Sequence, residues 1–333
     1  SPNSVAVYGD IVAVAVESDP KQDPGKVEFY SAADYTKLGE VTVGALPDMV
    51  TFNEDGTKVL TANEGEPSDD YLTDPEGSVS IVTLNTSNLS ASTVATADFT
   101  SFNNNIPAGV RVFGRSAAGE GDKADGFATT LAQDIEPEYI TVKGNKAYVT
   151  CQENNALAIV NIDNNTVESL LPLGTVDHSI AGNGLDASNR DDSIYISQWP
   201  IKGMYLPDAI ASFESNGNIY LISANEGDAR EYEYEDMNGD DVLAFIDETR
   251  VKDLKLDETA FPYADLLQQD DQLGRIKTSL VDGDTDGDGD HDEIYTYGTR
   301  SFTIWDAATG SVVWDSKNAL EQITKQRNPE NFN

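Results

Sequence analysis

The chain has 333 residues, with 21 Lys and Arg against 59 Asp and Glu, and its formal net charge is −38. Because nucleic acids and anionic lipids are bound by clustered cations, this charge excludes both classes of partner. The single cysteine excludes a disulfide framework, and no apolar run reaches the roughly 18 residues of a membrane-spanning helix, so we expect no direct membrane insertion. Such acidity suits salty or calcium-containing surroundings, although cytoplasmic proteins of halophiles look similar.

Short strands fill the first part of the chain. Residues 4–16 are apolar or small on both sides of Gly9-Asp10, a pattern that predicts a β-hairpin. Further strands are predicted at residues 27–30, 38–43, 46–52, 58–64 and 78–84. Helical periodicity is limited to Glu258–Gln269 and Lys317–Gln326. The composition of the elements therefore indicates an all-β protein.

One sequence phrase recurs along the chain. It consists of a proline and an acidic residue, a strand, a glycine turn, a strand that ends in glutamate, and a short pair of strands. Complete copies begin at Pro47, Pro137 and Pro207, and a partial copy covers residues 293–314. Repeats of four antiparallel strands indicate a β-propeller, in which such sheets stand radially around an axis. A β-sandwich is the alternative, but it does not explain why whole phrases recur.

The spacing of the phrases is enlarged by inserts at about residues 99–133, 174–204 and 229–292. Inserts of this size usually form functional loops on one face. We expect a single propeller domain over residues 1–333 with about five four-stranded blades, the first of which begins at its second strand. On this interpretation the propeller is incomplete at both ends.

The sharpest motif is the acidic segment from Asp282 to Glu293. Its carboxylates fall at positions 1, 3, 5 and 9, with Gly287 at position 6 and a glutamate at position 12, which is the ligand order of a calcium loop. Gly289 stands where an apolar residue is usual, and a strand follows, so a paired EF-hand is not expected. A solvated acidic turn is the alternative. The predicted Ca²⁺ ligands are Asp282, Asp284, Asp286, Asp290, Glu293 and the backbone carbonyl of Asp288.

The repeat places one glutamate at the end of each second strand. In a propeller these side chains, from Glu17, Glu64, Glu153 and Glu226, should converge on one channel mouth. A ring of carboxylates could hold a cation or activate a water beside it. The alternative is that each glutamate, with the amide residue before it, only satisfies backbone groups at its strand end.

Arginine is scarce, so its positions are informative. Arg230 follows an acidic segment, and Arg300 follows the strand at 293–297. Either guanidinium could clamp an anionic substrate beside bound calcium. The alternative is that each arginine pairs with its acidic neighbours. No nucleophile elbow and no nucleotide-binding glycine loop is evident.

Several segments together resemble the choice-of-anchor I domain family, and the resemblance runs over essentially the whole chain. They include Gly44-Ala-Leu-Pro-Asp-Met49, Ala62-Asn-Glu-Gly-Glu-Pro67, Asp134-Ile-Glu-Pro-Glu-Tyr139, Trp199-Pro-Ile-Lys-Gly-Met-Tyr205, Ala224-Asn-Glu-Gly-Asp-Ala-Arg230 and Arg300-Ser-Phe-Thr-Ile-Trp-Asp306. The resemblance implies a secreted or surface-anchored bacterial protein with a YVTN/WD40-like propeller, often seven-bladed. Some relatives carry alkaline phosphatase or phytase-like labels. Family members typically have an earlier blade and a later phytase-like segment, so another segment of the same protein is expected to supply missing blades.

Two functions follow as expectations. The first is a secreted or cell-surface, calcium-binding β-propeller that acts as a binding or adhesion module for an unidentified extracellular partner. The alternative is a calcium-dependent phosphohydrolase, in which Glu64, Glu153, Glu226, Arg230 and Arg300 are the candidate catalytic residues.

Overall fold

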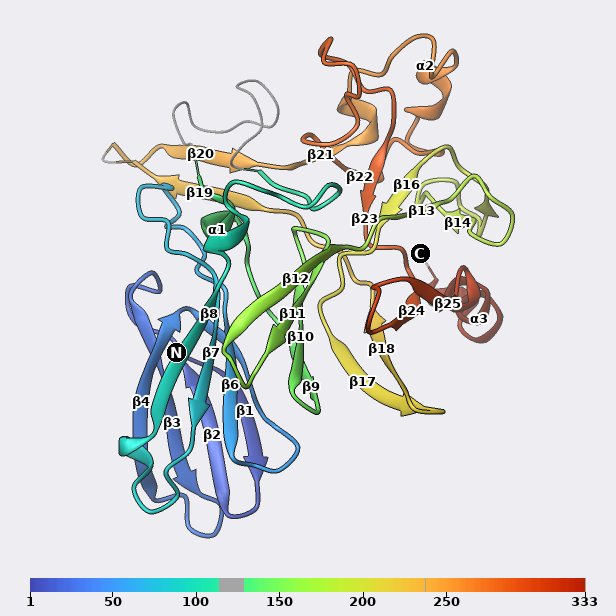
Figure 1. Ribbon diagram of the computed structural model, residues 1–333. Coiled ribbons are helices and arrows are strands. Elements are labelled where there is room, and N and C mark those ends of the chain that lie inside the picture. Colours follow the sequence, from blue (N-terminus) through green and yellow to red (C-terminus); the bar gives the residue numbers. More distant parts are fainter. Residues whose placement is uncertain (114–128, 237, 333) are drawn as a thin grey trace.

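The computed structural model describes residues 1–113, 129–236 and 238–332. Most of its strands belong to four antiparallel sheets of four strands each (Figure 1). The first sheet contains β1 (Pro2–Tyr8), β2 (Ile11–Val16), β3 (Pro24–Ser31) and β4 (Lys37–Ala45). The second contains β5 (Pro47–Phe52), β6 (Lys58–Asn63), β7 (Ser78–Thr83) and β8 (Thr93–Asp98). The third contains β9 (Ile140–Lys143), β10 (Lys146–Cys151), β11 (Ala156–Asn161) and β12 (Thr166–Pro172).

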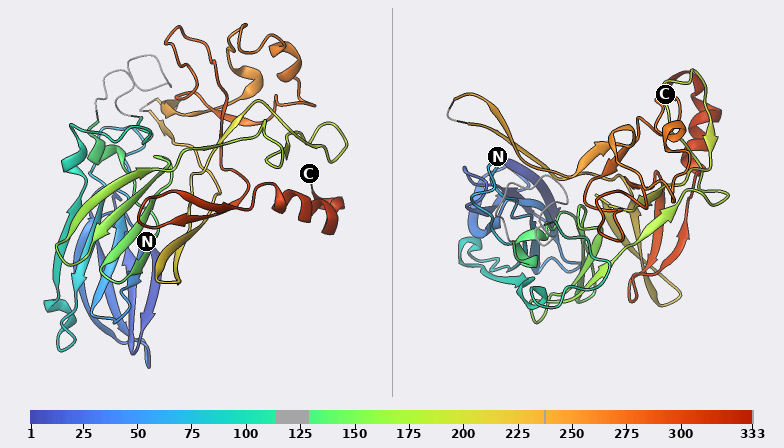
Figure 2. Two further views of the ribbon diagram at one scale, coloured as in Figure 1. Left: turned by 45° about the vertical axis from the view of Figure 1, so that its right-hand side comes forward. Right: turned by 90° about the horizontal axis from the view of Figure 1, so that it is seen from above.

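The fourth sheet is interrupted in the sequence. It pairs β17 (Ile210–Ser215) and β18 (Asn218–Ala224) with β24 (Phe302–Asp306) and β25 (Val312–Asp315). The first strands of successive sheets contact one another, β1 with β5, β5 with β9 and β9 with β17. Seen from above, the four sheets follow one another along an arc (Figure 2). Radial sheets with the first strand innermost are the blades of a β-propeller, and the predicted fold class is confirmed.

The middle strands of the blades are buried because each lies inside its sheet and between neighbouring sheets. Strands β6, β7, β10 and β11 are buried along almost their whole length. Many of their apolar side chains join one core between the second and third sheets, which includes Leu60, Ile81 and Val149 together with Phe99 and Leu170 from outside these strands. Strands that are buried on both faces tend to carry continuous apolar runs, as β11 does at residues 156–160.

The first and last repeats differ from the sequence expectation. The chain does not begin at the second strand of a blade, because β1 pairs with β2 as the first strand of a complete four-stranded sheet. The final repeat is divided between two sheets. Its first strand, β23 (Tyr295–Tyr297), leaves the blades, whereas β24 and β25 complete the fourth sheet. The described residues therefore form four four-stranded blades.

The inserts form a second layer beyond one end of the blades (Figure 1). A five-stranded sheet has the order β13 (Thr175–Asp177), β16 (Lys202–Met204), β23, β22 (Lys277–Ser279) and β21 (Glu248–Arg250). Strands β16 and β23 run parallel in it. Two hairpins accompany this sheet, β14 (Leu185–Asp186) with β15 (Ile196–Ser197), and β19 (Glu231–Glu235) with β20 (Asp241–Ile246). The layer has its own apolar core, which includes Trp199, Val251, Phe261, Leu273 and Ile294.

Helices are short. The insert at 99–133 contributes α1 (Leu131–Asp134), and residues 114–128 of that insert lie outside the described residues. The helix expected at 258–269 is reduced to α2 (Ala264–Leu267), since Pro262 cannot occupy a helix interior. The helix expected at 317–326 is present as α3 (Ala319–Arg327).

Candidate functional site

The acidic segment 282–293 lies between β22 and β23, but its first and last carboxylates are engaged elsewhere. Asp282 Oδ2 accepts a hydrogen bond from Arg111 Nε over 2.6 Å. Glu293 Oε1 lies 2.5 Å from Lys202 Nζ, and its Oε2 accepts a hydrogen bond from the Tyr295 hydroxyl over 2.6 Å. Positions 1 and 12 of the calcium-loop pattern therefore form ion pairs with distant cations.

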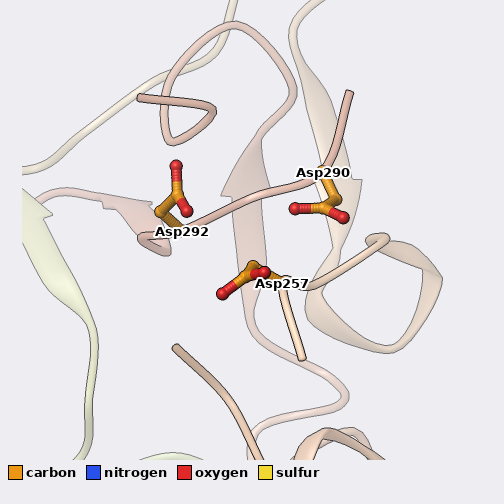
Figure 3. A group of neighbouring side chains, drawn as sticks. All are labelled: Asp257, Asp290 and Asp292. Atoms are coloured by element: carbon orange, nitrogen blue, oxygen red, sulfur yellow. The ribbon is translucent and has the colours of Figure 1, made fainter. Parts of the chain in front are cut away.

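The middle of the segment brings carboxylates together in two overlapping groups. Oxygens of Asp284, Asp286 and Asp292 lie within 4.8 Å of one another, and so do oxygens of Asp257, Asp290 and Asp292. Figure 3 shows the second group, whose three side chains come from two separate segments of the chain. Asp292 belongs to both groups. We name the five residues the aspartate cluster.

Sequence reasoning missed Asp257, because it lies in a different segment from the acidic loop. A parallel bridge between Leu256 and His291 brings the two segments together. The Asp257 amide donates to the His291 carbonyl over 3.1 Å, and the His291 amide donates to the Lys255 carbonyl over 2.8 Å. No local pattern in the sequence predicts this contact.

Backbone amides of the loop hold some of these carboxylates in place by hydrogen bonds. Asp284 accepts hydrogen bonds from the amides of Gly287 and Gly289, and the latter is the main cause of its lowered pKa. Asp288, the residue expected to offer its carbonyl, raises the pKa of Asp286 by charge repulsion. Within the described residues, Asp290 Oδ1 is buried and has no hydrogen-bond partner. Buried polar atoms normally have a partner, so this oxygen points to a missing one.

The donor set fits a hard cation. Two oxygens bound to one calcium ion at about 2.4 Å lie at most about 4.8 Å apart, so the observed spread of the oxygens is compatible with shared coordination. Carboxylate oxygens are also the ligands that Ca²⁺ prefers. An ion would neutralise charges that otherwise repel one another at this spacing.

Of the four glutamates expected in one ring, two lie together in the interior. Burial, followed by the charge of Glu66, raises the pKa of Glu64 to about 10. Burial likewise raises the pKa of both Glu153 and Glu138, whose carboxyl groups share a hydrogen bond. The pKa of Asp48 rises to about 6, first through burial and then through the charge of Asp208. The interior therefore favours the protonated forms of these acids.

Sequence reasoning missed part of this interior group, although the repeat contained the signal. Asp48, Glu138 and Asp208 are the acidic residues that follow the prolines of the recurring phrase. Each stands near the innermost strand of its blade, so successive copies meet near the axis. Glu17 lies apart, where its Oε2 accepts a hydrogen bond from Asn3 Nδ2 over 3.1 Å. Glu226 is exposed and lines a cavity described below.

Arg230 is buried within ion pairs. Its Nη1 lies 3.3 Å from Asp134 Oδ1 and its Nη2 lies 2.7 Å from Glu136 Oε2. Its guanidinium stacks 4.3 Å from the centre of the Phe113 ring, and Arg111 stacks on the same ring at 4.5 Å. Since only 2% of Arg230 is exposed, its guanidinium has no open path to a substrate. Its partners are acids that are distant in the sequence, and not the acidic segment 226–228 that precedes it.

Arg300 and Glu226 line the same cavity, whose volume is about 660 Å³. Arg300 Nη1 donates to the Asp186 carbonyl over 2.8 Å and to Glu321 Oε1 over 2.6 Å. Two glycines bring the segments of Glu226 and Arg300 together. Gly227 and Gly298 have φ of +86° and +70°, and a Cβ on Gly227 would lie 2.0 Å from the Gly298 nitrogen. Only glycine permits this approach of two backbones.

Within residues 1–113, 129–236 and 238–332, no helix is long and apolar enough to cross a membrane. No curated protein sequence matches the chain. The solved structures that match the chain share little sequence with it. Hydrazine synthase from Kuenenia stuttgartiensis has a TM-score of 0.36 and 11% identity over 72% of this chain and 56% of that chain. The β-propeller domain of Cps50 (Swd1) from Myceliophteria thermophila has a TM-score of 0.35 and 9% identity over 95% of this chain and 72% of that chain.

A functionally unknown protein from Desulfotomaculum acetoxidans is similar to the same degree, with a TM-score of 0.35 and 10% identity over 95% of this chain and 71% of that one. The chain spans little more than half of the hydrazine synthase chain. A family model, that of the choice-of-anchor I domain, matches residues 1–333. The chain belongs to the choice-of-anchor I domain family.

Proposed function

We propose that this domain is a secreted or cell-surface β-propeller that calcium stabilises and that binds an extracellular partner. The aspartate cluster is the observation that supports calcium binding. Its two groups of carboxylate oxygens share Asp292. Asp290 Oδ1, which belongs to one of these groups, is buried and accepts no hydrogen bond within the described residues. Calcium sites of extracellular modules are weak, with dissociation constants of about 0.1 to 1 mM, and a partly exposed cluster suits that range.

In this proposal calcium acts as a structural link. Asp257 lies in the segment before α2, whereas Asp290 and Asp292 lie just before β23. An ion held between them would fix these two segments of the insert layer to each other. It would also lower the charge repulsion that otherwise opposes the compact loop. Because an ion that binds only the folded state stabilises that state, calcium should raise the melting temperature.

The test is thermal unfolding in calcium, in magnesium and in chelator, together with calorimetric titration. Millimolar calcium should raise the melting temperature by several degrees, and Asp292→Asn should abolish most of that rise. Asp10→Asn is a matched control, since Asp10 lies in the exposed turn between β1 and β2. Equal melting temperatures in calcium and chelator, with no heat of binding, would overturn the proposal.

The extracellular location is supported by membership of the family and by a charge of −38, which suits calcium-containing surroundings. Intact cells that make the natural protein should expose the domain to added protease. Protection in intact cells, with digestion after lysis, would contradict this location.

We also propose that further blades of the same protein cover the outer faces of the first and fourth sheets. On the first sheet, Val5 and Val7 are 64% and 62% exposed and lie opposite Val14 and Val12 on the same face. On the fourth sheet, Ile304 pairs with Ile222 and with Trp314, which is 48% exposed. Blades pack face to face, and exposed apolar faces of this kind mark a packing surface. In a longer natural chain the Trp314 indole should be better shielded from a water-soluble quencher than it is in this domain alone. Equal quenching of Trp314 in the two proteins would contradict the proposal.

The alternative function, a calcium-dependent phosphohydrolase, requires an accessible arginine beside the ion. Arg230 is buried, and none of the five aspartates lines the cavity that contains Arg300 and Glu226. The binding module is therefore the function that the geometry supports best.

A further inference from the structure

The cavity beside Arg300 has an unusual charge for this protein. Arg250 and Arg275 also line it, so three arginines face one space in a chain that has 59 acidic residues. In the described part of the chain, neither Arg250 nor Arg275 has a carboxylate within ion-pair distance, whereas Arg300 pairs with Glu321. The charges of these two half-buried guanidiniums are therefore not balanced by an ion pair, although the chain is rich in acidic residues.

Neutral acceptors hold these two side chains in place. Arg250 Nη1 donates to the backbone carbonyl of Arg275, and Arg275 Nε donates to Asn189 Oδ1 over 2.9 Å. These contacts use only some of the five donors that each guanidinium carries. Because like charges repel, two arginines without an ion-pair partner at one cavity favour the entry of an anion. The arrangement is therefore prepared for an oxyanion.

The remaining walls suit a small organic molecule. The volume of about 660 Å³ lies within the range of small-molecule sites, roughly 300 to 1,000 Å³. Apolar groups come from Ala187, Ile276 and Leu320, and polar groups from Ser188 and Ser301. These walls can contact the body of a ligand while the arginines hold its charged end.

Two of the acidic residues at the cavity are already engaged. Glu321 pairs with Arg300, and Asp186 accepts a hydrogen bond from the Tyr195 amide over 3.0 Å. Glu226 is the exposed carboxylate at the cavity. It should disfavour a ligand with charge on that side and so orient the anionic group toward the arginines.

We propose that this cavity is a binding site for a small organic molecule with an oxyanion group, a phosphate monoester or a carboxylate, which Arg250 and Arg275 bind. Charge-assisted hydrogen bonds from two guanidiniums would supply most of the selectivity. The site is independent of the aspartate cluster and of the proposed calcium.

The test is calorimetric titration of the whole domain in a phosphate-free buffer of low ionic strength, with and without calcium. Glucose 6-phosphate, glucuronate and neutral glucose are the probes, and inorganic phosphate and citrate report on the oxyanion alone. We expect binding of an anionic probe, weakened by salt, and no binding of glucose. Preference for glucose 6-phosphate over glucuronate would assign the phosphate monoester, and the reverse preference the carboxylate.

Variants locate the binding. Arg250→Gln and Arg275→Gln should each weaken anion binding about tenfold or more, because each removes charge-assisted hydrogen bonds. Arg190→Gln makes the same charge change at an exposed arginine outside the cavity and should leave binding within about twofold. Glu226→Gln should tighten binding, since it removes a negative charge at the cavity.

Melting temperatures check that the variants fold. Arg250 and Arg275 have no ion pair to lose in the described residues, so both variants should melt close to the wild type. If none of the four anions binds, or if both cavity variants bind as the wild type does, the proposal is wrong. Binding that disappears in chelator would assign the anion to bound calcium and would also overturn it.

Discussion

Arg230 Nη2 lies 2.7 Å from Glu136 Oε2, and only 2% of the arginine and 3% of the glutamate are exposed. This ion pair joins the start of the β19–β20 hairpin to the segment that precedes the third blade. It therefore fastens the insert layer to the propeller. The nearby Phe113 ring excludes water from one side of the guanidinium.

Replacement of one partner in this pair should destabilise the fold strongly. Arg230→Met leaves the carboxylate of Glu136 buried without this cation, and breaking such a pair typically costs about 3 to 5 kcal/mol. Urea unfolding measures the change. Lys143→Met is the control, because its partner Glu54 lies at the surface and such pairs contribute far less to stability. Equal losses in both variants would contradict the structural role of Arg230.

The raised pKa of Glu64 predicts how stability depends on pH. Its pKa rises from 4.5 to about 10 on folding, mainly through burial. Above pH 4.5 the unfolded chain releases this proton while the folded protein retains it. The contribution of Glu64 is therefore fully present below pH 4.5 and is lost as the pH rises toward 10. For one group the slope is at most about 1.4 kcal/mol per pH unit.

Glu64→Gln removes this titration and should gain stability over the wild type as the pH rises from 5 to 9, as unfolding in chelator would show. Glu226→Gln is the control, because Glu226 holds the same place in the repeat but is exposed. A constant difference between Glu64→Gln and the wild type across this range would show that the Glu64 carboxyl is not buried in its protonated form.

Much of the fold could be predicted because its signals are local. Strand periodicity and glycine turns identified the hairpins of all four blades, and the recurring phrase identified the propeller. The fate of the last repeat could not be predicted. Its strand β23 pairs in parallel with β16, which lies more than 90 residues earlier in the chain, and such a pairing leaves no local mark. The insert layer was therefore visible in the sequence only as long spacers.

The candidate sites were less predictable than the fold, because they too depend on contacts between segments that are distant in the sequence. The acidic loop was evident as a motif, but its first and last carboxylates form ion pairs with cations that are distant in the sequence. Arg111, which pairs with Asp282, is 171 residues away from it. Asp257 approaches the loop only through a bridge between two irregular segments. A motif specifies which residues are available, and tertiary contacts determine which of them face one another.

The crossing of Gly227 and Gly298 should be intolerant of any side chain. In Gly298→Ala the new Cβ would lie 2.0 Å from the Glu226 carbonyl oxygen, and the residue would also have a positive φ. We expect a loss of several kcal/mol in the free energy of unfolding, and a weaker anion site at the adjacent cavity. Gly217→Ala is the control, since Gly217 has φ +78° but nothing within 4 Å of an added Cβ, and it should cost only about 1 kcal/mol. Similar losses in the two variants would show that backbone conformation, and not the crossing, is the constraint.

Calcium titration of loop variants distinguishes the aspartate cluster from an EF-hand-like loop. In an EF-hand the glutamate at position 12 binds the ion with both oxygens, so its loss abolishes binding. Here Glu293 pairs with Lys202, and Glu293→Gln should change calcium affinity only slightly. Asp257→Asn lies outside the loop motif, yet it should remove the ion shared with Asp290 and Asp292 while leaving the group at Asp284. The titrations should thus show lower stoichiometry for Asp257→Asn and the largest loss for Asp292→Asn. If Glu293→Gln abolished binding and Asp257→Asn had no effect, the ligand order of the sequence motif would be correct, and the arrangement proposed from the two groups would be wrong.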